Sequence, residues 1–401
     1  MIETIGHLPI SEPSVERPLV SVVMPCLNEA EALPSCIHKI YSAFATAGVT
    51  GEIVVCDNGS TDNSVAIAES LGARVVHQPL RGYGNAYIKG FESARGDYLI
   101  MGDADDTYDF TQIPEFLDYL RQRGCDFVTG SRYLKGGQGK IPLLHRIVGN
   151  PALTALLNFL FGTHYTDVYC GFRGFTRQAY DLIQPVSPGM EFNLELAINA
   201  GLASLNIAEL PIVLHPRKGE SKLRTFQDGW RSLRMMLIYC PNKVFLFPGL
   251  SFLAMGLLIH VVVLLDLIKY NGQPLGAVTG IVAAIFSVVG FEVLSLGLHV
   301  KTYSWSRRFD RDNALLQWFY SRFTLEVGLI IGLATALVGS IIMAVLIVEW
   351  FKLSMMPIPQ PGWASFAATL IIIGIGTVFS SLFISAMSMK KGPEEKSSSS
   401  L

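Results

Sequence analysis

Four long apolar segments in the C-terminal part of the chain constrain its fold more than any other feature of the sequence. Each holds the roughly 20 apolar residues that a helix needs to cross the ~30 Å hydrocarbon layer of a membrane. A helix buried in a soluble core is the alternative for any one of them, but such helices are usually shorter and carry a polar face. The sequence therefore predicts four membrane-spanning helices, at residues 245–267, 275–299, 324–348 and 363–387.

Basic residues predict the orientation of these helices. The two loops on one side hold only Lys269 and Lys352, whereas two lysines follow the fourth segment and five basic residues lie between the second and third: Lys301, Arg307, Arg308, Arg311 and Arg322. Because loops rich in Lys and Arg remain in the cytoplasm, both ends of the chain and the middle loop are expected there. The N-terminus lacks the basic and apolar stretches of a signal peptide. We expect an integral, multi-pass protein of the plasma or inner membrane.

One carboxylate, Glu292, falls within the second apolar segment. A charge at the centre of a membrane helix costs ~3 kcal/mol, which the surrounding Leu, Ile, Val and Phe outweigh. Two interpretations remain open: a functional group with His260 of the first segment as its partner, or one side of a structural hydrogen bond between helices.

The first 240 residues read as an α/β domain. Short β-rich runs occur at residues 20–24, 53–56, 74–77, 98–101 and 127–129. They alternate with stretches of helical periodicity near residues 30–47, 63–71, 85–94 and 113–123. Strands that alternate with helices predict a Rossmann-like parallel sheet covered on both faces. Ligands of such sheets bind outside the carboxyl ends of the strands.

Several classes of protein are excluded. The net charge of -2 provides no general basic surface for a nucleic acid, so no nucleic-acid partner is expected. The six cysteines form no C-x-x-C pair, which argues against a zinc site or a disulfide framework and fits a reducing cytosol. R-G-Y-G-N-A-Y (Arg81–Tyr87) lacks the third glycine of a dinucleotide fingerprint, and G-G-Q-G-K-I (Gly136–Ile141) lacks two elements of a P-loop.

Acidic residues follow the fourth β-rich run. Asp103 and Asp105 are two residues apart, so both carboxylates project to one side if the segment is extended. Carboxylates together with water and a diphosphate suit Mg²⁺ or Mn²⁺, and the ion would neutralise a departing nucleotide. In isolation such a pair is more often a solvated turn, but its position after a strand favours a metal site.

Polar residues also follow the first two runs. Asp57 and Glu29 are candidates to contact a base, a ribose or a nearby backbone donor. The alternative is helix N-capping, because Asp, Asn and Ser before a helix satisfy its free N–H groups. Capping is an equally good interpretation for Asn58 and Ser60.

The ordered motifs resemble a known family. P-C-L-N-E, D-N-G-S-T-D, D-A-D and G-S-R resemble family 2 glycosyltransferases with the GT-A fold; they occupy residues 25–29, 57–62, 103–105 and 130–132. T-D-V-Y-C-G-F-R, E-L-P-I and R-K-G-E-S-K-L resemble the dolichyl-phosphate mannose synthase and bacterial polyprenyl-phosphate glycosyltransferase branch; they occupy residues 166–173, 209–212 and 217–223. The resemblance spans about residues 19–235. One departure is Asn58, where the family often has a second acid.

The resemblance implies roles for individual residues. Asp103 and Asp105 would hold the metal, and the donor would be bound by Pro25, Leu27, Glu29, Asp57, Asp103 and Ala104. The expected catalytic residues are Asp105, Arg132 and Asp167. The departure at Asn58 weakens the inference about the base and leaves the chemistry unchanged.

A second phosphate-binding locus is expected for a lipid acceptor. Arg132, Arg217 and Lys222 lie after the donor motifs, and arginine matches phosphate oxygens. The alternative is that residues 217–224 only mark the cytoplasmic boundary of a membrane span. Asp167 would orient the acceptor or a sugar hydroxyl, or it would pair structurally with Arg173.

The expected organisation is an N-terminal tail (1–18), a cytosolic GT-A domain (19–222), an amphipathic interfacial region (223–243), a four-helix membrane domain (244–389) and a disordered cytoplasmic tail (390–401). In the interfacial region Phe226, Trp230, Leu233 and Leu237 repeat at helical spacing, with Arg224, Arg231 and Arg234 elsewhere on the turn. Such a helix lies on a membrane surface. Ordinary packing against the soluble domain is the alternative.

The expected reaction transfers a hexose, with inversion, from a nucleotide sugar to a polyprenyl or dolichyl phosphate for cell-envelope or glycoconjugate assembly. UDP-glucose is the first donor expected and GDP-mannose the second, both from the resemblance. A processive polysaccharide synthase is a rival, although Q-D-G-W-R (Gln227–Arg231) only superficially resembles the Q-x-x-R-W of that group. A transporter or scaffold with a degenerate nucleotide domain is the non-enzymatic rival. Self-association into a homo-oligomer is left open.

Overall fold

The structure is a computed structural model that describes residues 17–135, 149–216, 225–270, 273–306, 323–353 and 361–388. The chain divides into two compact units, Met1–Arg234 and Met235–Leu401. The first unit is α/β and the second is helical.

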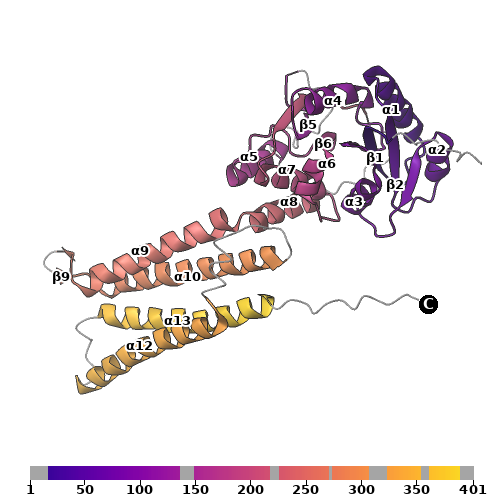
Figure 1. Ribbon diagram of the computed structural model, residues 1–401. Helices are drawn as coiled ribbons and strands as arrows, with labels where there is room; N and C mark the ends of the chain where they lie inside the picture. The colour runs from indigo at the N-terminus through magenta and orange to yellow at the C-terminus, as the bar shows by residue number, and fades with distance from the viewer. Residues whose placement is uncertain are drawn as a thin grey trace, which may run out of the picture. The chain divides into compact units, whose positions relative to one another are not determined.

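A mixed seven-stranded sheet forms the centre of the first unit (Figure 1). Its order is β3-β2-β1-β4-β6-β5-β7. The strands are β1 Val20–Cys26, β2 Gly51–Asp57, β3 Arg74–His77, β4 Tyr98–Met101, β5 Phe127–Ser131, β6 Arg173–Thr176 and β7 Ile207–Pro211. All neighbours are parallel except that β6 runs antiparallel to β4 and β5. The expectation of a wholly parallel sheet is therefore wrong at β6, a four-residue strand that begins with a charged residue and gives no β-rich run.

Helices cover both faces of this sheet. Val22 and Met24 point into a core with α1 Leu33–Ala47 and α4 Ile113–Arg121, which follows the short 3₁₀ helix η1 Phe110–Gln112. Val23, on the opposite face, packs in a second core, whose helices are α3 Tyr83–Ser93, α6 Arg177–Ile183 and α7 Phe192–Leu202. Alternation along β1 thus builds both layers. This unit also contains α2 Ser64–Ser70, α5 Asn150–Phe161 and the first part of α8 Thr225–Tyr239.

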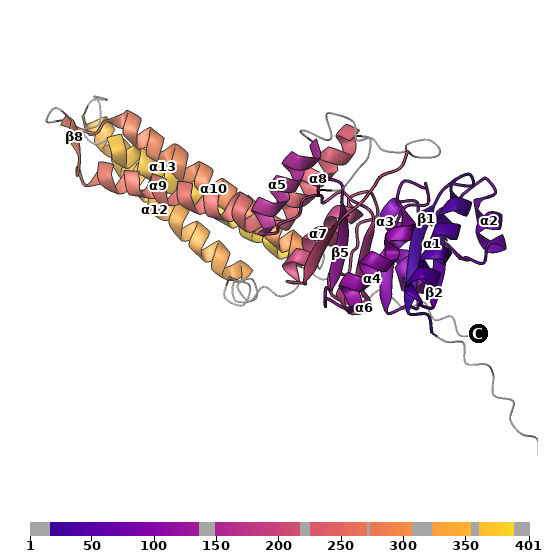
Figure 2. The ribbon, with the colours of Figure 1, turned by 90° about the horizontal axis from the view of Figure 1, so that it is seen from above.

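The second unit contains four long apolar helices that run alongside one another (Figure 1 and Figure 2). They are α9 Phe247–Leu264, preceded by the π-helical η3 Asn242–Leu246, then α10 Ala277–Ser306, α12 Leu325–Lys352 and α13 Pro361–Ser388. Strands β8 Lys269–Tyr270 and β9 Gln273–Pro274 pair between α9 and α10. The segments long and apolar enough to span a membrane are Asn242–Leu264, Ala277–Tyr303, Leu325–Lys352 and Pro361–Met387. The four predicted spans are therefore all present as helices.

Small residues let these helices approach closely. A Cβ atom at Gly290 of α10 would lie 2.2 Å from the backbone nitrogen of Leu253 in α9, and one at Gly374 of α13 would lie 2.4 Å from that of Ala336 in α12. Helix α10 also contacts α13. Close backbone approach of this kind is typical of helices that associate within a membrane.

The polar residues of these helices differ from one expectation. His260 Nε2 lies 3.2 Å from Thr369 Oγ1, and the side chain is buried. Glu292 is exposed on α10. His260 thus bonds to α13 rather than to Glu292, so the first of the two open interpretations loses the partner that it named.

Helix α8 Thr225–Tyr239 contains part of the predicted amphipathic region. Among the α8 side chains that the structure describes, Ser232 and Met236 are buried, whereas Trp230 is 59% exposed and Arg231 is also exposed. The face that packs against protein is thus offset from the expected apolar stripe. Arg224 and the side chain of Phe226 lie outside the described part of the chain.

Candidate active site

The loops after β1 and β2 bond to each other. Cys26 pairs in register with Asp57, so both loops begin at the same edge of the sheet. The Asn28 backbone N–H donates to Ser60 Oγ (3.0 Å), and Thr61 N–H donates to Asn28 Oδ1 (2.7 Å). Glu29 N–H donates to Ser64 Oγ (2.9 Å). The two predicted clusters therefore form one interlocked structure.

Asp57 is a buried acceptor within these loops. Its carboxylate accepts from the backbone N–H groups of Ser60 (2.9 Å) and Gly59 (3.2 Å) and lies 3.3 Å from His77 Nδ1. Burial raises the pKa of Asp57, but the hydrogen bonds from Ser60, His77 and Gly59 outweigh it and leave the pKa below its ordinary value. Asp57 is thus an ionised group held in one position.

The other predicted donor residues lie at the same edge with different exposure. Pro25 and Leu27 are partly exposed, whereas Glu29 and Ala104 are buried. None of the capping predicted for Asn58 or Ser60 occurs. Helix α2 has no side-chain cap bond, and the nearby bond to Ser64 N–H comes from Asp62 Oδ1 (3.0 Å).

Asn58 instead joins β2 to the segment before α3. Its amide Nδ2 donates to the carbonyl oxygens of Gln78 (2.9 Å) and Leu80 (2.8 Å), and its Oδ1 accepts from Gly82 N–H (2.8 Å). An aspartate offers no donor for the two carbonyls. The departure from the family pattern therefore has a structural reason.

Asp103 follows β4, which pairs with β1 at the same sheet edge. The hydroxyls of Tyr83 and Tyr87 donate to Asp103 Oδ1, at 3.0 and 3.2 Å. Asp105 Oδ1 accepts from Thr107 N–H (3.0 Å). Residues 104 and 105 form a turn, whereas an extended segment would be needed to project both carboxylates to one side.

Both tyrosines remain protonated donors. Burial, together with the charge of Asp103, raises the pKa of Tyr83 and of Tyr87 well above the usual value. Both tyrosines lie in R-G-Y-G-N-A-Y (Arg81–Tyr87), which fails as a dinucleotide fingerprint. Their spacing of four residues on one helix places both on the same face, and this spacing could have predicted that they bind one partner together.

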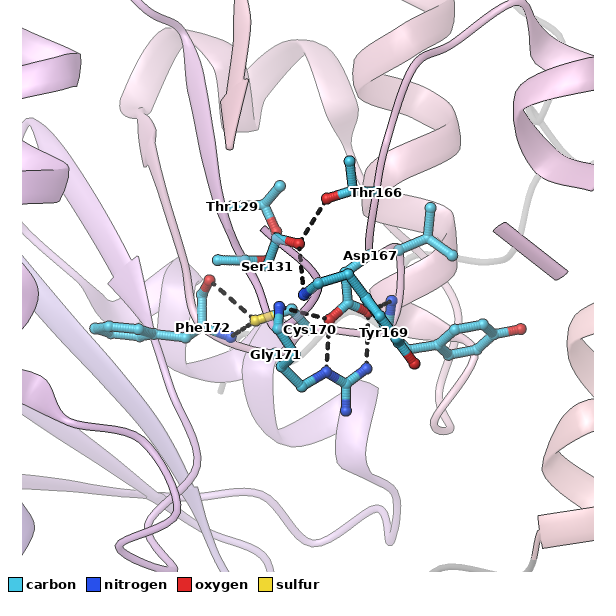
Figure 3. Close-up of polar contacts among 12 residues, drawn as sticks. Thr129, Ser131, Thr166, Asp167, Tyr169, Cys170, Gly171 and Phe172 are labelled. Carbon is cyan, nitrogen blue, oxygen red and sulfur yellow. Dashed lines mark hydrogen bonds and ion pairs between the residues drawn. The ribbon is translucent and has the colours of Figure 1, made fainter. Parts of the chain in front are cut away.

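A second charged locus follows β5 (Figure 3). Arg132 forms a two-pronged ion pair with Asp167, with Nε–Oδ2 at 2.5 Å and Nη2–Oδ1 at 2.7 Å. Asp167 is fully buried and also accepts from the backbone N–H groups of Arg132 (3.2 Å) and Tyr169 (3.2 Å). Burial lowers the pKa of Arg132, but the hydrogen bonds and the charge of Asp167 raise it by more. The pKa of Arg132 is therefore above its ordinary value.

The expected alternative of an Asp167–Arg173 pair is wrong. The Arg173 guanidinium donates to the backbone carbonyls of Cys170 (2.9 Å), Asn193 (2.5 Å) and Val168 (2.7 Å). Arg173 therefore shapes the loop, while Asp167 holds Arg132.

The E-L-P-I and T-D-V-Y-C-G-F-R segments meet at this locus. Each Glu209 carboxylate oxygen accepts from Thr166 N–H at 2.9 Å, and Oε1 also accepts from Asp167 N–H at 3.3 Å. Ser131 Oγ lies 2.6 Å from Thr166 Oγ1 (Figure 3). Burial raises the pKa of Glu209. Glu209 thus fixes the backbone that carries Asp167.

Hydrogen bonds connect the two charged loci. Gly171 N–H donates to Tyr108 Oη (2.8 Å), and Asn193 Nδ2 donates to Tyr83 Oη (3.1 Å). Burial raises the pKa of Tyr108 well above its usual value; Asp103 raises it further and Arg132 lowers it. The charges of Asp103 and Arg132 therefore shift the pKa of the buried Tyr108 hydroxyl in opposite directions.

Comparisons with known proteins agree with this geometry. Residues 21–183 match the model of glycosyl transferase family 2, and residues 298–388 match the glycosyltransferase family 2 C-terminal transmembrane region. The low-salt glycan biosynthesis hexosyltransferase Agl6 of Haloferax volcanii is 37% identical over 383 residues, which cover 95% of this chain and 92% of that protein. The chain belongs to glycosyl transferase family 2.

This family 2 glycosyltransferase is also similar to a second curated protein and to one solved structure. A dolichyl-phosphate hexose transferase of Haloferax volcanii is 36% identical over 211 residues, covering 52% of this chain and 89% of that protein. Glucosyl-3-phosphoglycerate synthase from Mycobacterium tuberculosis has a TM-score of 0.45 and 23% identity, covering 56% of this chain and 80% of that one.

The chain is thus an integral membrane glycosyltransferase with a GT-A domain and a helical C-terminal region. The expected family and enzyme class are confirmed, and a transporter or scaffold is set aside. Arg217 and Lys222, expected at the acceptor phosphate, lie outside the described residues.

Proposed function

We propose that the protein transfers a hexose from a nucleotide sugar to a polyprenyl or dolichyl phosphate. UDP-glucose is the first donor to test and GDP-mannose the second. The proposal depends mainly on the hydrogen bonds that lead from Asp103 through Tyr83 to Asn193. The Asn193 carbonyl accepts from Arg173, whose guanidinium also binds the loop that carries Asp167, the partner of Arg132. The same chain has four apolar helices long enough to span a membrane. A membrane location supports a lipid acceptor, and so does the similarity to a dolichyl-phosphate hexose transferase.

We propose that Asp103 and Asp105 hold Mg²⁺ or Mn²⁺ together with the donor diphosphate. No group of three His, Cys, Asp or Glu side chains suited to a metal occurs in the described ranges. Two carboxylates nevertheless fit, because Mg²⁺ at phosphate sites takes one or two carboxylates and completes its shell with water and substrate phosphates. When bound, the ion would neutralise charge on the diphosphate leaving group.

In the proposed reaction an oxygen of the lipid phosphate attacks the anomeric carbon of the donor. The bond from that carbon to the diphosphate breaks, the nucleoside diphosphate leaves with the electron pair, and the anomeric centre inverts. A phosphate monoester has a second pKa of about 6, so the acceptor needs no strong general base at neutral pH. Asp103 keeps its position through the two tyrosine hydroxyls.

Arg132 is proposed to contact the acceptor phosphate. Asp167 engages its Nε and Nη2, and Nη1 takes no part in that pair. Asp167 then acts as a positioning residue that keeps the cation in place. Arg217 and Lys222 remain proposed phosphate ligands on the grounds of their charge and motif.

We also propose that the catalytic domain and both termini are cytoplasmic. The proposal follows from Lys and Arg in the loop between the second and third spans. The proposed boundaries remain those given by the sequence: residues 19–222 for the GT-A domain, 223–243 for the interfacial region and 244–389 for the membrane domain.

The decisive experiment supplies membranes with polyprenyl phosphate and a panel of radiolabelled nucleotide sugars. We expect label from one donor to enter the chloroform phase as a product that mild acid cleaves. Asp103→Asn is expected to reduce this incorporation by about 100-fold or more, because the metal ion that would compensate the developing negative charge is held less tightly. Asp118→Asn, a surface carboxylate paired with Arg123, is the matched control and should leave the rate unchanged.

Other outcomes would refute the proposal. Label that stays aqueous with every donor would exclude a lipid-linked product. Label that enters a polymer would favour the processive synthase. An unchanged transfer rate in Asp103→Asn would show that Asp103 does not take part in the reaction.

A further inference from the structure

A cavity of about 260 Å³ lies in the membrane unit among α10, α12 and α13. Most of its wall is hydrocarbon, contributed by Phe291, Leu294, Leu298, Phe323, Ile331 and Ile384. Ser295, Thr377, Ser380 and Ser381 complete the lining. None of these residues takes part in the charged loci of the first unit. The cavity is somewhat smaller than the 300–1,000 Å³ typical of small-molecule pockets, which suits a segment of a longer ligand.

The hydroxyl groups of this wall are already paired. Ser295 Oγ and His299 Nε2 each lie 2.8 Å from Ser380 Oγ. Thr377 and Ser381 each donate to a carbonyl one turn earlier in α13, at 2.8 and 2.7 Å. A buried water typically needs two to four polar partners. A wall whose hydroxyls are engaged therefore favours a hydrocarbon occupant.

The cavity lies at one end of the helices. Leu298 is in the last third of α10, Phe323 precedes α12, and Ile384 is near the end of α13. Lys301, one turn beyond Leu298, donates from Nζ to Asn242 Oδ1 at 2.9 Å. Asn242 begins η3, where the chain enters the first membrane span. The cavity is therefore near the membrane face through which the chain arrives from the catalytic unit.

We propose that this cavity binds a segment of the isoprenoid chain of the acceptor lipid, an inference that rests on the function proposed above. A lipid whose phosphate reacts in the catalytic unit must keep its chain in the leaflet on that side. Moving a chain from bilayer to cavity gains no hydrophobic free energy, because both surroundings are apolar. Preference must come from van der Waals packing against the side chains that line the cavity. The proposal therefore requires a methyl-branched chain to pack there better than a linear acyl chain.

A pair of substitutions on α12 tests the proposal by kinetics. Ile331 lines the cavity and is 47% exposed, so Ile331→Trp fills space without displacing a buried side chain. We expect the KM for a long polyprenyl phosphate to rise about tenfold, with the KM for the nucleotide sugar unchanged. Leu333→Trp, at a 61% exposed position outside the cavity lining, is the matched control and should change neither constant. Equal KM values for the acceptor in both variants would overturn the proposal.

A binding measurement separates this proposal from the proposed function. The full chain in nanodiscs is irradiated with a polyprenyl phosphate that carries a photoreactive diazirine in its chain, without any donor. We expect labelled peptides from α10, α12 and α13, competition by unlabelled polyprenyl phosphate, and weaker labelling of Ile331→Trp. Equal competition by phospholipid would identify an ordinary acyl-chain site and refute the proposal. Labelling that persists in a protein that transfers no hexose would refute the function and leave the site standing.

Discussion

The side-chain amide of Asn58 holds the segment between β3 and α3 in place. Its three hydrogen bonds join the end of β2 to the segment that leads into α3, and α3 carries the two tyrosines that hold Asp103. A substitution at Asn58 is therefore expected to shift α3 and, through its two tyrosines, the position of Asp103. The family pattern with two acids would not provide the same connection.

Asn58→Asp is expected to destabilise the catalytic unit by about 1 kcal/mol, because the partly buried carbonyl groups of Gln78 and Leu80 lose their donor and face a carboxylate. Thermal unfolding of the solubilised chain should reveal a lower midpoint, and transfer activity should fall with it. Asn63→Asp is the matched control, since Asn63 is exposed and its side chain makes no cap bond to α2. An unchanged midpoint in Asn58→Asp would mean that the loop does not depend on this amide.

The sequence was a better guide to which candidate residues lie at the sheet edge than to their hydrogen-bond partners. Asp57, Asp103 and Arg132 were identifiable because they follow β-rich runs, and strand ends meet at one edge of a sheet. The partner of Asp167 was not identifiable. Arg132 and Arg173 are both near motifs, and only the path of the loop before β6 decides which guanidinium meets the carboxylate.

At the element scale, the contact between α9 and α10 depends on glycine. The amide of Leu253 occupies the space that a side chain at Gly290 would need. The sequence predicted the helices from their apolar length, but it carried no motif in this region that revealed which faces meet. The pairing of β6 could not be predicted from the sequence for a similar reason, because its partners β4 and β5 are distant along the chain.

Gly290→Ala is expected to force α9 and α10 apart, since the added Cβ would lie 2.2 Å from a backbone nitrogen that cannot rotate away. Overpacking of this kind typically costs 1–3 kcal/mol. Gly276→Ala is the control, because nothing lies within 4 Å of a Cβ at that position. The thermal midpoint of the membrane unit should fall for the first variant only; equal midpoints would contradict the close packing.

At the scale of the whole molecule, charge outside the helices and apolar length within them together predict one membrane topology. A green fluorescent protein fused after Leu401 should fluoresce in cells, because it would fold in the cytoplasm. Alkaline phosphatase inserted after Lys352 should be active, because that loop is expected on the opposite side. Active phosphatase at the C-terminus would reverse the orientation and place the catalytic unit away from cytosolic nucleotide sugars.

The interlocked loops after β1 and β2 have a consequence for how donor preference changes. The backbone amides of Asn28, Glu29 and Thr61 are bonded across the two loops before any substrate arrives, so these loops are ordered during folding. A donor that binds there, as proposed, meets a preorganised surface and gains affinity without paying for loop closure. Exchange of one sugar for another during evolution would then proceed by replacing individual side chains on a rigid frame rather than by remodelling the backbone.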